Sequence, residues 1–155
     1  MIHAMILAVA LLVPTAAPTP ETDAKTLAQD ILTNGAVMFD TKDATAMADT
    51  YTDDGELTVF SKDETTGRYK AQDTRGKSAV EQFYQDIFKD RKAGARSKNV
   101  VELAHFVGDD LLIIHGNFTP AVGDSAPVPF VQVRAKEGEK WLIKSLQLFV
   151  VSEKK

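Results

Sequence analysis

The sequence has no cysteine, and this absence excludes several kinds of chemistry. Without cysteine the chain forms no disulfide bond and offers no thiolate nucleophile and no cysteine-ligated zinc or iron–sulfur site. Positive charge is also scarce, since 18 Lys and Arg residues stand against 22 Asp and Glu residues, a formal net charge of −4. Because non-specific binding to nucleic acid needs a basic surface, we expect no nucleic-acid partner.

Cofactor motifs are absent as well. The sequence contains no glycine-rich phosphate loop, no dinucleotide fingerprint and no Ser/His/Asp arrangement with a nucleophile elbow. Two histidines, His105 and His115, fall on neighbouring expected strands, but without a clear third ligand they are a weak indication of a metal. We therefore predict no cofactor and no metal site.

The composition is that of one ordinary globular domain. The chain has 155 residues, of which 44% are hydrophobic and 26% are charged. A chain of this length is too short for two domains of ordinary size. The proportions of hydrophobic and charged residues argue against a disordered chain.

The first 18 residues have the layout of a cleavable secretory signal peptide. An unbroken apolar run from Met5 to Val13 is followed by small residues and prolines, and about 20 apolar residues would be needed to span a bilayer. We expect residues 1–18 to be removed and residues 19–155 to form a secreted or periplasmic domain with no stable membrane anchor. No Lys or Arg precedes the run, which leaves an uncleaved anchor and a mis-called start codon as the alternatives.

The mature chain shows helical patterns first and strand patterns afterwards. A helix begins at Thr19-Pro20-Glu21 and continues to about Phe39. A short helix and a third, strongly apolar helix follow, and Ser78 with Glu81 fits a capping box at the start of the third. Strands are expected at about 57–59, 68–72, 99–107, 111–119, 128–135 and 141–151. This order predicts an α+β fold.

The stretch YTDDGELTVF, residues 51–60, carries three carboxylates around one glycine. Its acids do not follow the alternating pattern of a calcium-binding loop of the hand type. We interpret Asp53-Asp54-Gly55 as the stop of the short helix, with the strand beginning after it.

Three motifs resemble the nuclear transport factor 2-like superfamily, in its SnoaL-like branch: MADTYTDDGEL, RGKSAVEQFY and VRAKEGEKWLIKSLQLF. The resemblance covers about residues 22–151. It implies a cone-shaped, strongly curved antiparallel sheet packed on N-terminal helices, often with a pocket at the wide end. Steroid isomerases of the superfamily carry a catalytic aspartate and a tyrosine. The positions here that match the aspartate are about Thr58 and Val59, and the position that matches the tyrosine is near Gly35. We therefore do not expect steroid-isomerase chemistry.

Several residues are candidates for the pocket wall. A turn at Glu137-Gly138 would place Arg134 opposite Trp141 and Gln132 opposite Ile143, on a face that mixes apolar and polar groups. Arg134 is interpreted either as a rim residue that covers Trp141, which we favour, or as the receptor of a ligand carboxylate. The candidates for the binding pocket are His115, Gln132, Arg134, Trp141 and Tyr84.

The two histidines can be interpreted as catalytic or as structural residues. A two-residue turn at Gly108-Asp109 would place Glu102 opposite His115, which could orient that histidine as a base in a pocket. The favoured alternative is a packed, hydrogen-bonded histidine.

The last two expected strands look apolar on both faces, since Val131, Val133, Leu142, Leu146, Leu148 and Val150 lie opposite the mixed face. An antiparallel sheet that is covered on one side normally alternates, so we expect a second subunit to cover the other side. This predicts a homodimer formed through the sheet. The basic run Lys89, Arg91, Lys92, Arg96 and Lys98 is interpreted as a solvated helix end.

Three functions remain open at this point. The first is an exported domain that binds a small, partly apolar ligand without a demonstrable catalytic set. The second is an isomerase, dehydratase or hydrolase that uses His115 or His105 as a base and Arg134 as an anion stabiliser. The third is a structural or protein-interaction domain whose cone is filled by its own side chains, such as Phe83, Tyr84 and Phe88.

Overall fold

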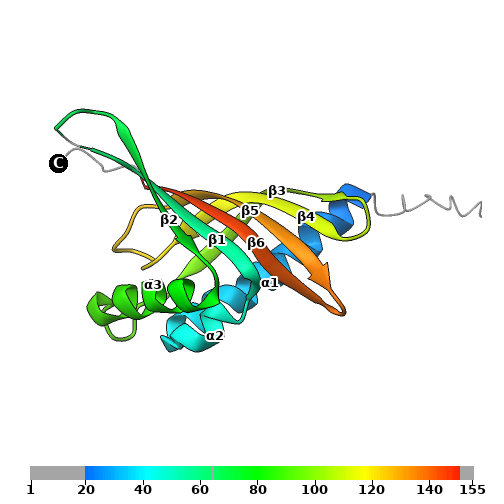
Figure 1. The fold of residues 1–155 in the computed structure, drawn as a ribbon, viewed down its shortest axis with the longest axis horizontal. Coiled ribbons are helices and arrows are strands. Elements are labelled where there is room, and N and C mark those ends of the chain that lie inside the picture. Colours follow the sequence, from blue (N-terminus) through cyan, green and yellow to red (C-terminus); the bar gives the residue numbers. More distant parts are fainter. Residues whose placement is uncertain (1–19, 64, 151–155) are drawn as a thin grey trace, which may run out of the picture.

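The computed structural model describes residues 20–63 and 65–150, and in them helices precede most of the strands (Figure 1). The elements are α1 (Pro20–Thr41), α2 (Ala44–Ala48), β1 (Tyr51–Lys62), β2 (Tyr69–Arg75), α3 (Lys77–Asp90), β3 (Lys98–Val107), β4 (Leu111–Thr119), β5 (Val128–Glu137) and β6 (Lys140–Val150). The predicted signal peptide lies outside these residues. None of the helices in the described part is long and apolar enough to cross a membrane.

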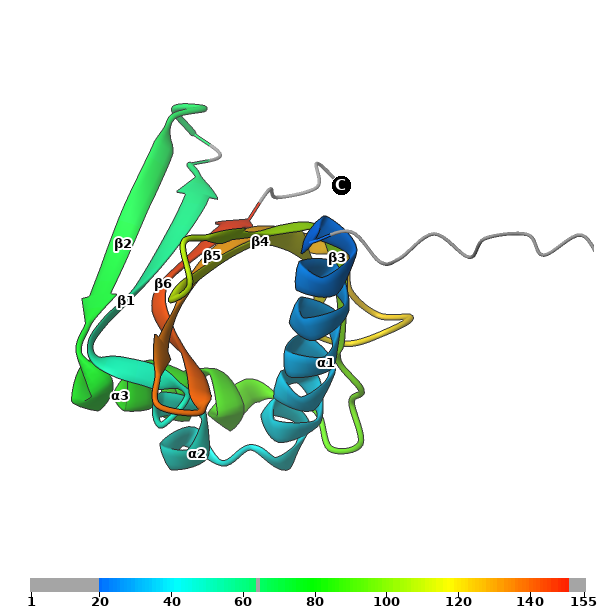
Figure 2. The same ribbon diagram turned by 90° about the vertical axis from the view of Figure 1, so that its right-hand side faces the viewer.

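The six strands form one curved sheet in the order β2-β1-β6-β5-β4-β3. Figure 2 shows the sheet strongly bent, with α1 along one side of its curve and α2 and α3 along the adjacent side. The predicted α+β fold with a strongly curved sheet is confirmed. The sheet is mixed, because β1 pairs with β6 in parallel, while the C-terminal strands β3 to β6 form the expected antiparallel meander.

Local turn residues set the hairpin positions. Gly108 and Gly138 both have positive φ angles of 65° and 61°, which glycine adopts without strain. The observed strands β3 to β6 therefore begin and end within two residues of their predicted limits. The last turn lies one residue later than predicted, because Glu137 still pairs with Lys140.

The stretch Asp53-Asp54-Gly55 lies inside a strand, so its interpretation as a helix stop is wrong. Helix α2 already ends at Ala48, and β1 begins at Tyr51. Between Tyr51 and Glu56 the pairing of β1 with β6 shifts, which makes this stretch a bulge. A Cβ atom on Gly55 would lie 2.8 Å from the carbonyl oxygen of Ile143, so close backbone approach requires glycine there.

Strand β6 bulges at the same place. Ile143 pairs with Arg134 on β5, but the next pair joins Ser145 to Val133, so Lys144 is an extra residue in β6. The ammonium group of Lys144 forms an ion pair with Asp54 across the two bulges. The carboxylates of the stretch are therefore surface groups of a double bulge.

The predicted capping box at the start of α3 is also wrong. Gly76 is the N-cap residue and no side chain caps the helix. The carboxylate of Glu81 instead accepts a 2.7 Å hydrogen bond from the Thr45 hydroxyl of α2. Glu81 therefore joins two helices.

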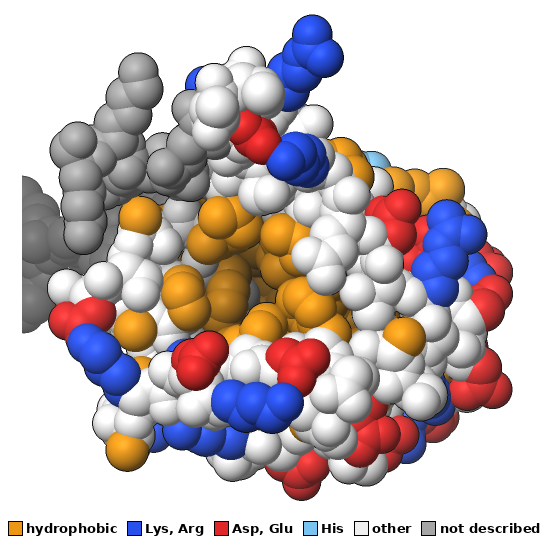
Figure 3. All heavy atoms as spheres, turned by 60° about the vertical axis from the view of Figure 1, so that its left-hand side comes forward, with side chains coloured by type: hydrophobic (Ala, Val, Ile, Leu, Met, Phe, Trp, Pro, Cys, Tyr) orange, Lys and Arg blue, Asp and Glu red, His pale blue; other side chains and the backbone are white. Residues whose placement is uncertain are grey.

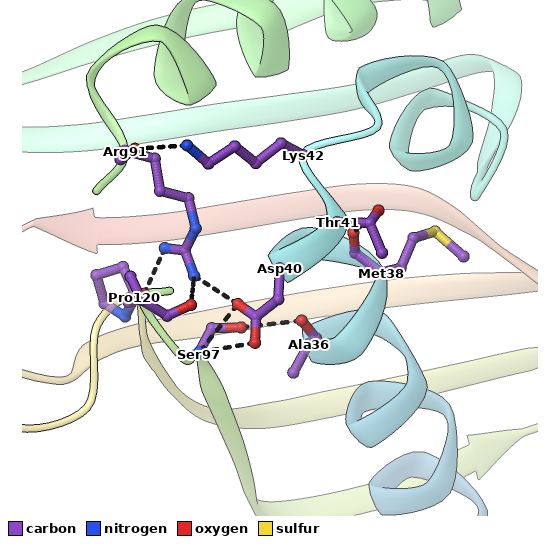
Figure 4. A network of polar contacts seen from close by, with 9 residues as sticks. Ala36, Met38, Asp40, Thr41, Lys42, Arg91, Ser97 and Pro120 are labelled. Carbon is purple, nitrogen blue, oxygen red and sulfur yellow. Dashed lines mark hydrogen bonds and ion pairs between the residues drawn. The ribbon is translucent and has the colours of Figure 1, made fainter. Parts of the chain in front are cut away.

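One residue of the basic run is a buried structural group. The guanidinium of Arg91 pairs with Asp40, and their side chains are only 6% and 12% exposed (Figure 4). Arg91 also donates to the carbonyl oxygens of Pro120 and Ala95, at 2.5 Å and 3.0 Å, and lies 4.6 Å from the ring centroid of Phe39. The network joins the end of α1 to two loops, so the interpretation of Arg91 as a solvated residue is wrong.

Candidate functional site: an apolar cavity with a buried arginine

A cavity of about 250 Å³ lies between the concave face of the sheet and the helices. Its lining comes from α1, α2, α3 and every strand from β3 to β6. Figure 3 shows the apolar hollow at the surface, with charged side chains around its rim. Two lining residues, Ile87 and Val150, are 38% and 36% exposed, which places them at the mouth.

The bulge in β6 supplies one wall of this cavity. Trp141 and Ile143 share a face with Arg134, but the extra residue Lys144 brings the next apolar residues to the same face. Leu146, Leu148 and Val150 consequently line the cavity. The prediction that these three lie on the outer face is wrong, since it assumed unbroken alternation along β6.

An aromatic cluster forms the helical side of the cavity. The ring of Phe39 makes edge contacts with Tyr84, Phe88 and Phe118, at centroid distances of 6.3, 5.0 and 5.1 Å. Such edge-to-face pairs hold rings in fixed relative orientations. The cluster packs beside the cavity without filling it, so these side chains do not fill the cone as the third hypothesis requires.

Arg134 is the most unusual residue of the lining. Arg134 is only 5% exposed. None of the ion pairs among the described residues includes Arg134. The Nε atom donates to Gln132 Oε1 at 2.6 Å, and the NH1 nitrogen donates to the carbonyl oxygen of Trp141 at 2.7 Å. The favoured interpretation of Arg134 as an exposed rim residue is wrong.

Burial lowers the pKa of Arg134 to about 10, and the phenols of Tyr51 and Tyr84 act in the opposite direction. The guanidinium therefore stays charged at neutral pH despite its surroundings. A charged group without a carboxylate partner in an apolar cavity is costly, because the surroundings replace little of the lost hydration.

Two buried tyrosines lie near this guanidinium. Their hydroxyl groups share one hydrogen bond of 3.0 Å, and Tyr84 lines the cavity. Burial raises the pKa of Tyr84 to about 12 and that of Tyr51 well above its ordinary value. Both phenols are therefore neutral at physiological pH and can donate hydrogen bonds.

Three of the five predicted pocket residues, Tyr84, Gln132 and Arg134, line the cavity. The ring of Trp141 lies against Phe106, and the ammonium group of Lys136, rather than Arg134, lies over it at 5.8 Å. Only the backbone of Trp141 reaches Arg134.

His115 does not line the cavity. It pairs with Leu103 and Val131 and alternates with buried Ile114, which places it on the outer face of the sheet. The predicted pairing with Glu102 is wrong, because Val107 pairs with Leu111 across a three-residue turn, so that His115 lies opposite Leu103. Glu102 instead accepts a hydrogen bond from Asn117.

The remaining polar residues of the lining are satisfied locally. The Thr50 hydroxyl donates to Met47, and the Asn99 amide donates to Leu32. Among the described residues, the cavity lining includes no carboxylate, histidine or lysine. Across the described parts of the chain, no group of three or more His, Cys, Asp or Glu residues is placed to hold a metal ion. The charge of the site thus comes from Arg134.

No family model matches the sequence, and no curated protein matches it either. Many solved structures are similar in fold. A domain of unknown function with a cystatin-like fold from Nostoc punctiforme PCC 73102 is 16% identical, with a TM-score of 0.61 over 83% of this chain and 77% of that one. A nuclear transport factor 2-like protein of unknown function from Shewanella oneidensis MR-1 is 15% identical, with a TM-score of 0.61 over 83% and 98%.

A third similar structure is described as the beta subunit of a candidate aromatic-ring-hydroxylating dioxygenase from Novosphingobium aromaticivorans DSM 12444. It is 12% identical, with a TM-score of 0.60 over 85% of this chain and 92% of that one. The chain has the nuclear transport factor 2-like fold, also called cystatin-like, which confirms the fold that the resemblance implies. The SnoaL-like branch stays a prediction, because likeness at this identity defines the fold alone.

Proposed function

We propose that the protein is an exported domain of the SnoaL-like type that binds a small, partly apolar molecule in its cavity. The observation that carries the proposal is an apolar cavity of about 250 Å³ with a few polar groups gathered around Arg134. Ligand sites commonly combine a largely apolar lining with a small number of polar groups that orient the ligand. The histidine-based enzyme gains no support, because neither His105 nor His115 lines the cavity.

Native mass spectrometry of protein purified from its own host tests ligand binding. We expect an added small-molecule mass that is lost on denaturation. The matched control is Leu148→Trp, which places a larger ring in the lining and should abolish the added mass. Protein that carries no small molecule and binds none of a panel of small apolar acids, amides and hydrocarbons would contradict the proposal.

Export is tested separately by determining the N-terminus of the protein recovered from the periplasm or the medium. We expect a chain that has lost about the first 18 residues. An intact N-terminus in a membrane fraction would support the uncleaved anchor instead.

A further inference from the structure

We propose that the ligand of this cavity is a small organic acid whose carboxylate binds the guanidinium of Arg134, with its hydrocarbon part against the apolar wall. This inference rests on the proposed function and names the chemical class that the same cavity takes.

The first argument is the missing counter-ion. Arg134 is 5% exposed, and no described carboxylate lies within ion-pairing distance of it. A buried charge is normally paired, because an isolated ion in a poorly polar environment loses most of its hydration. A ligand anion would provide the partner that the chain itself does not.

The second argument is the count of hydrogen-bond donors. A guanidinium carries five N–H donors, and two of its nitrogens already donate to Gln132 and to the carbonyl oxygen of Trp141. The NH2 nitrogen of Arg134 has no partner among the described residues. Among these residues, every fully buried side-chain nitrogen or oxygen has a hydrogen-bond partner. Since the NH2 nitrogen has none, it is not fully buried and borders open space. Because Arg134 lines the cavity, that space is the cavity.

The two existing hydrogen bonds also orient the group. Gln132 holds the Nε edge and the backbone of Trp141 holds one terminal nitrogen, so the plane of the guanidinium is fixed. A fixed guanidinium plane favours planar carboxylates, which match its fork geometry.

The third argument is a second donor beside the arginine. Tyr51 and Tyr84 share one hydrogen bond, so one of their two hydroxyl protons is left over. When Tyr51 donates to Tyr84, the proton of Tyr84 is free to bind a carboxylate oxygen in the cavity that this residue lines.

The size of the cavity limits the rest of the ligand. An apolar cavity of about 150 Å³ is known to hold benzene. At about 250 Å³, this cavity has room for a benzene-sized ring with a short acidic chain. A doubly charged phosphate fits less well, because the described residues of the lining offer one cationic side chain.

Isothermal titration calorimetry with 3-phenylpropanoate and 3-phenylpropanamide tests the inference, since the two differ only in the charged group. We expect the wild-type protein to bind the acid about tenfold or more tightly than the amide. In Arg134→Met this preference should disappear through loss of affinity for the acid. The matched control is Lys136→Met, two residues further along the same face of β5 but exposed, which should keep the preference.

The outcomes separate the two proposals. Equal binding of acid and amide to the wild type would overturn the carboxylate assignment and leave the ligand-binding function intact. A preference for the acid that survives in folded Arg134→Met, or that vanishes in Lys136→Met, would overturn the role of Arg134. Binding of neither compound, nor of propylbenzene, would overturn both. The wild-type comparison needs no variant, so the test holds even if Arg134→Met fails to fold.

Discussion

The hydroxyl of Tyr84 links stability to pH at the scale of a single residue. In an unfolded chain a tyrosine ionises near pH 10, whereas burial raises the pKa of folded Tyr84 to about 12. The folded state therefore keeps this proton in a range where the unfolded state has lost it. The stability gained from Tyr84 is complete below pH 10 and is lost as the pH rises towards 12.

We predict that wild-type protein loses on the order of 1 kcal/mol of stability between pH 8 and pH 11 through this residue, and that Tyr84→Phe lacks this loss. The difference between the two proteins isolates this effect from the opposite effect of Arg134, whose pKa is lowered by burial. Urea unfolding at both pH values measures it, with the exposed Tyr69→Phe as a control that behaves as the wild type. Identical pH dependence in wild type and Tyr84→Phe would contradict the prediction.

Asp40 is a second residue whose effect can be predicted singly. Its carboxylate pairs with buried Arg91 and accepts the backbone N–H of Ser97 at 3.0 Å (Figure 4). Asp40→Asn keeps the shape but leaves Arg91 charged and without its partner. Removing one member of a buried ion pair typically costs about 3 kcal/mol or more.

Chemical denaturation of Asp40→Asn measures this loss. Asp86→Asn is the control, because Asp86 pairs with Lys89 at an exposed site where salt bridges contribute little. An equal stability change in the two variants would show that burial of the pair is not decisive.

At the scale of elements, two glycines should respond in opposite directions to the same change. Gly35 lies within α1 and a Cβ atom there would meet nothing within 4 Å, so Gly35→Ala should stabilise by about 0.5–1 kcal/mol. Gly55 lies in the bulge of β1, where a Cβ atom would be 2.8 Å from a backbone oxygen. Gly55→Ala should destabilise by roughly 1–3 kcal/mol. Thermal unfolding of both variants checks the pair, and shifts of the same sign would be inconsistent with it.

The limits of most elements could be predicted from the sequence because their causes are local. Pro20 begins α1, and glycines such as Gly108 define tight turns. The register of β1 could not be predicted, because its parallel pairing with β6, and the bulge between Tyr51 and Glu56 in that pairing, form only when two strands that are distant in the sequence meet. The extra residue Lys144 likewise breaks the alternation of β6 against β5.

Only the part of the candidate site that depends on local sequence pattern could be predicted. Alternation along β5 placed Gln132 and Arg134 on one face, and this is the face that lines the cavity. The burial of Arg134 depends on helices that cover the sheet, which no pattern within the strand records. The meeting of Tyr51 with Tyr84, 33 residues apart, likewise has no local signal.

For the whole molecule, the homodimer stays a prediction. The outer face of β3, β4 and β5 carries apolar residues, and Leu103 and Val107 are each 43% exposed. Light scattering at micromolar concentration should give the mass of two chains. Val107→Glu should shift the protein to monomer, because it places a charge on that face, while Val37→Glu on the exposed side of α1 should not. A wild-type monomer would contradict the prediction.

The extra residue in β6 makes the chain unequally tolerant of two kinds of genetic change. Exchanging exposed Lys144 for another side chain costs the molecule a surface ion pair. Deleting its codon would turn the rest of the strand, from Ser145 to Val150, over to the opposite face, sending Leu146, Leu148 and Val150 away from the cavity. Deleting one codon would thus remove one wall of the cavity, although every remaining amino acid stayed the same.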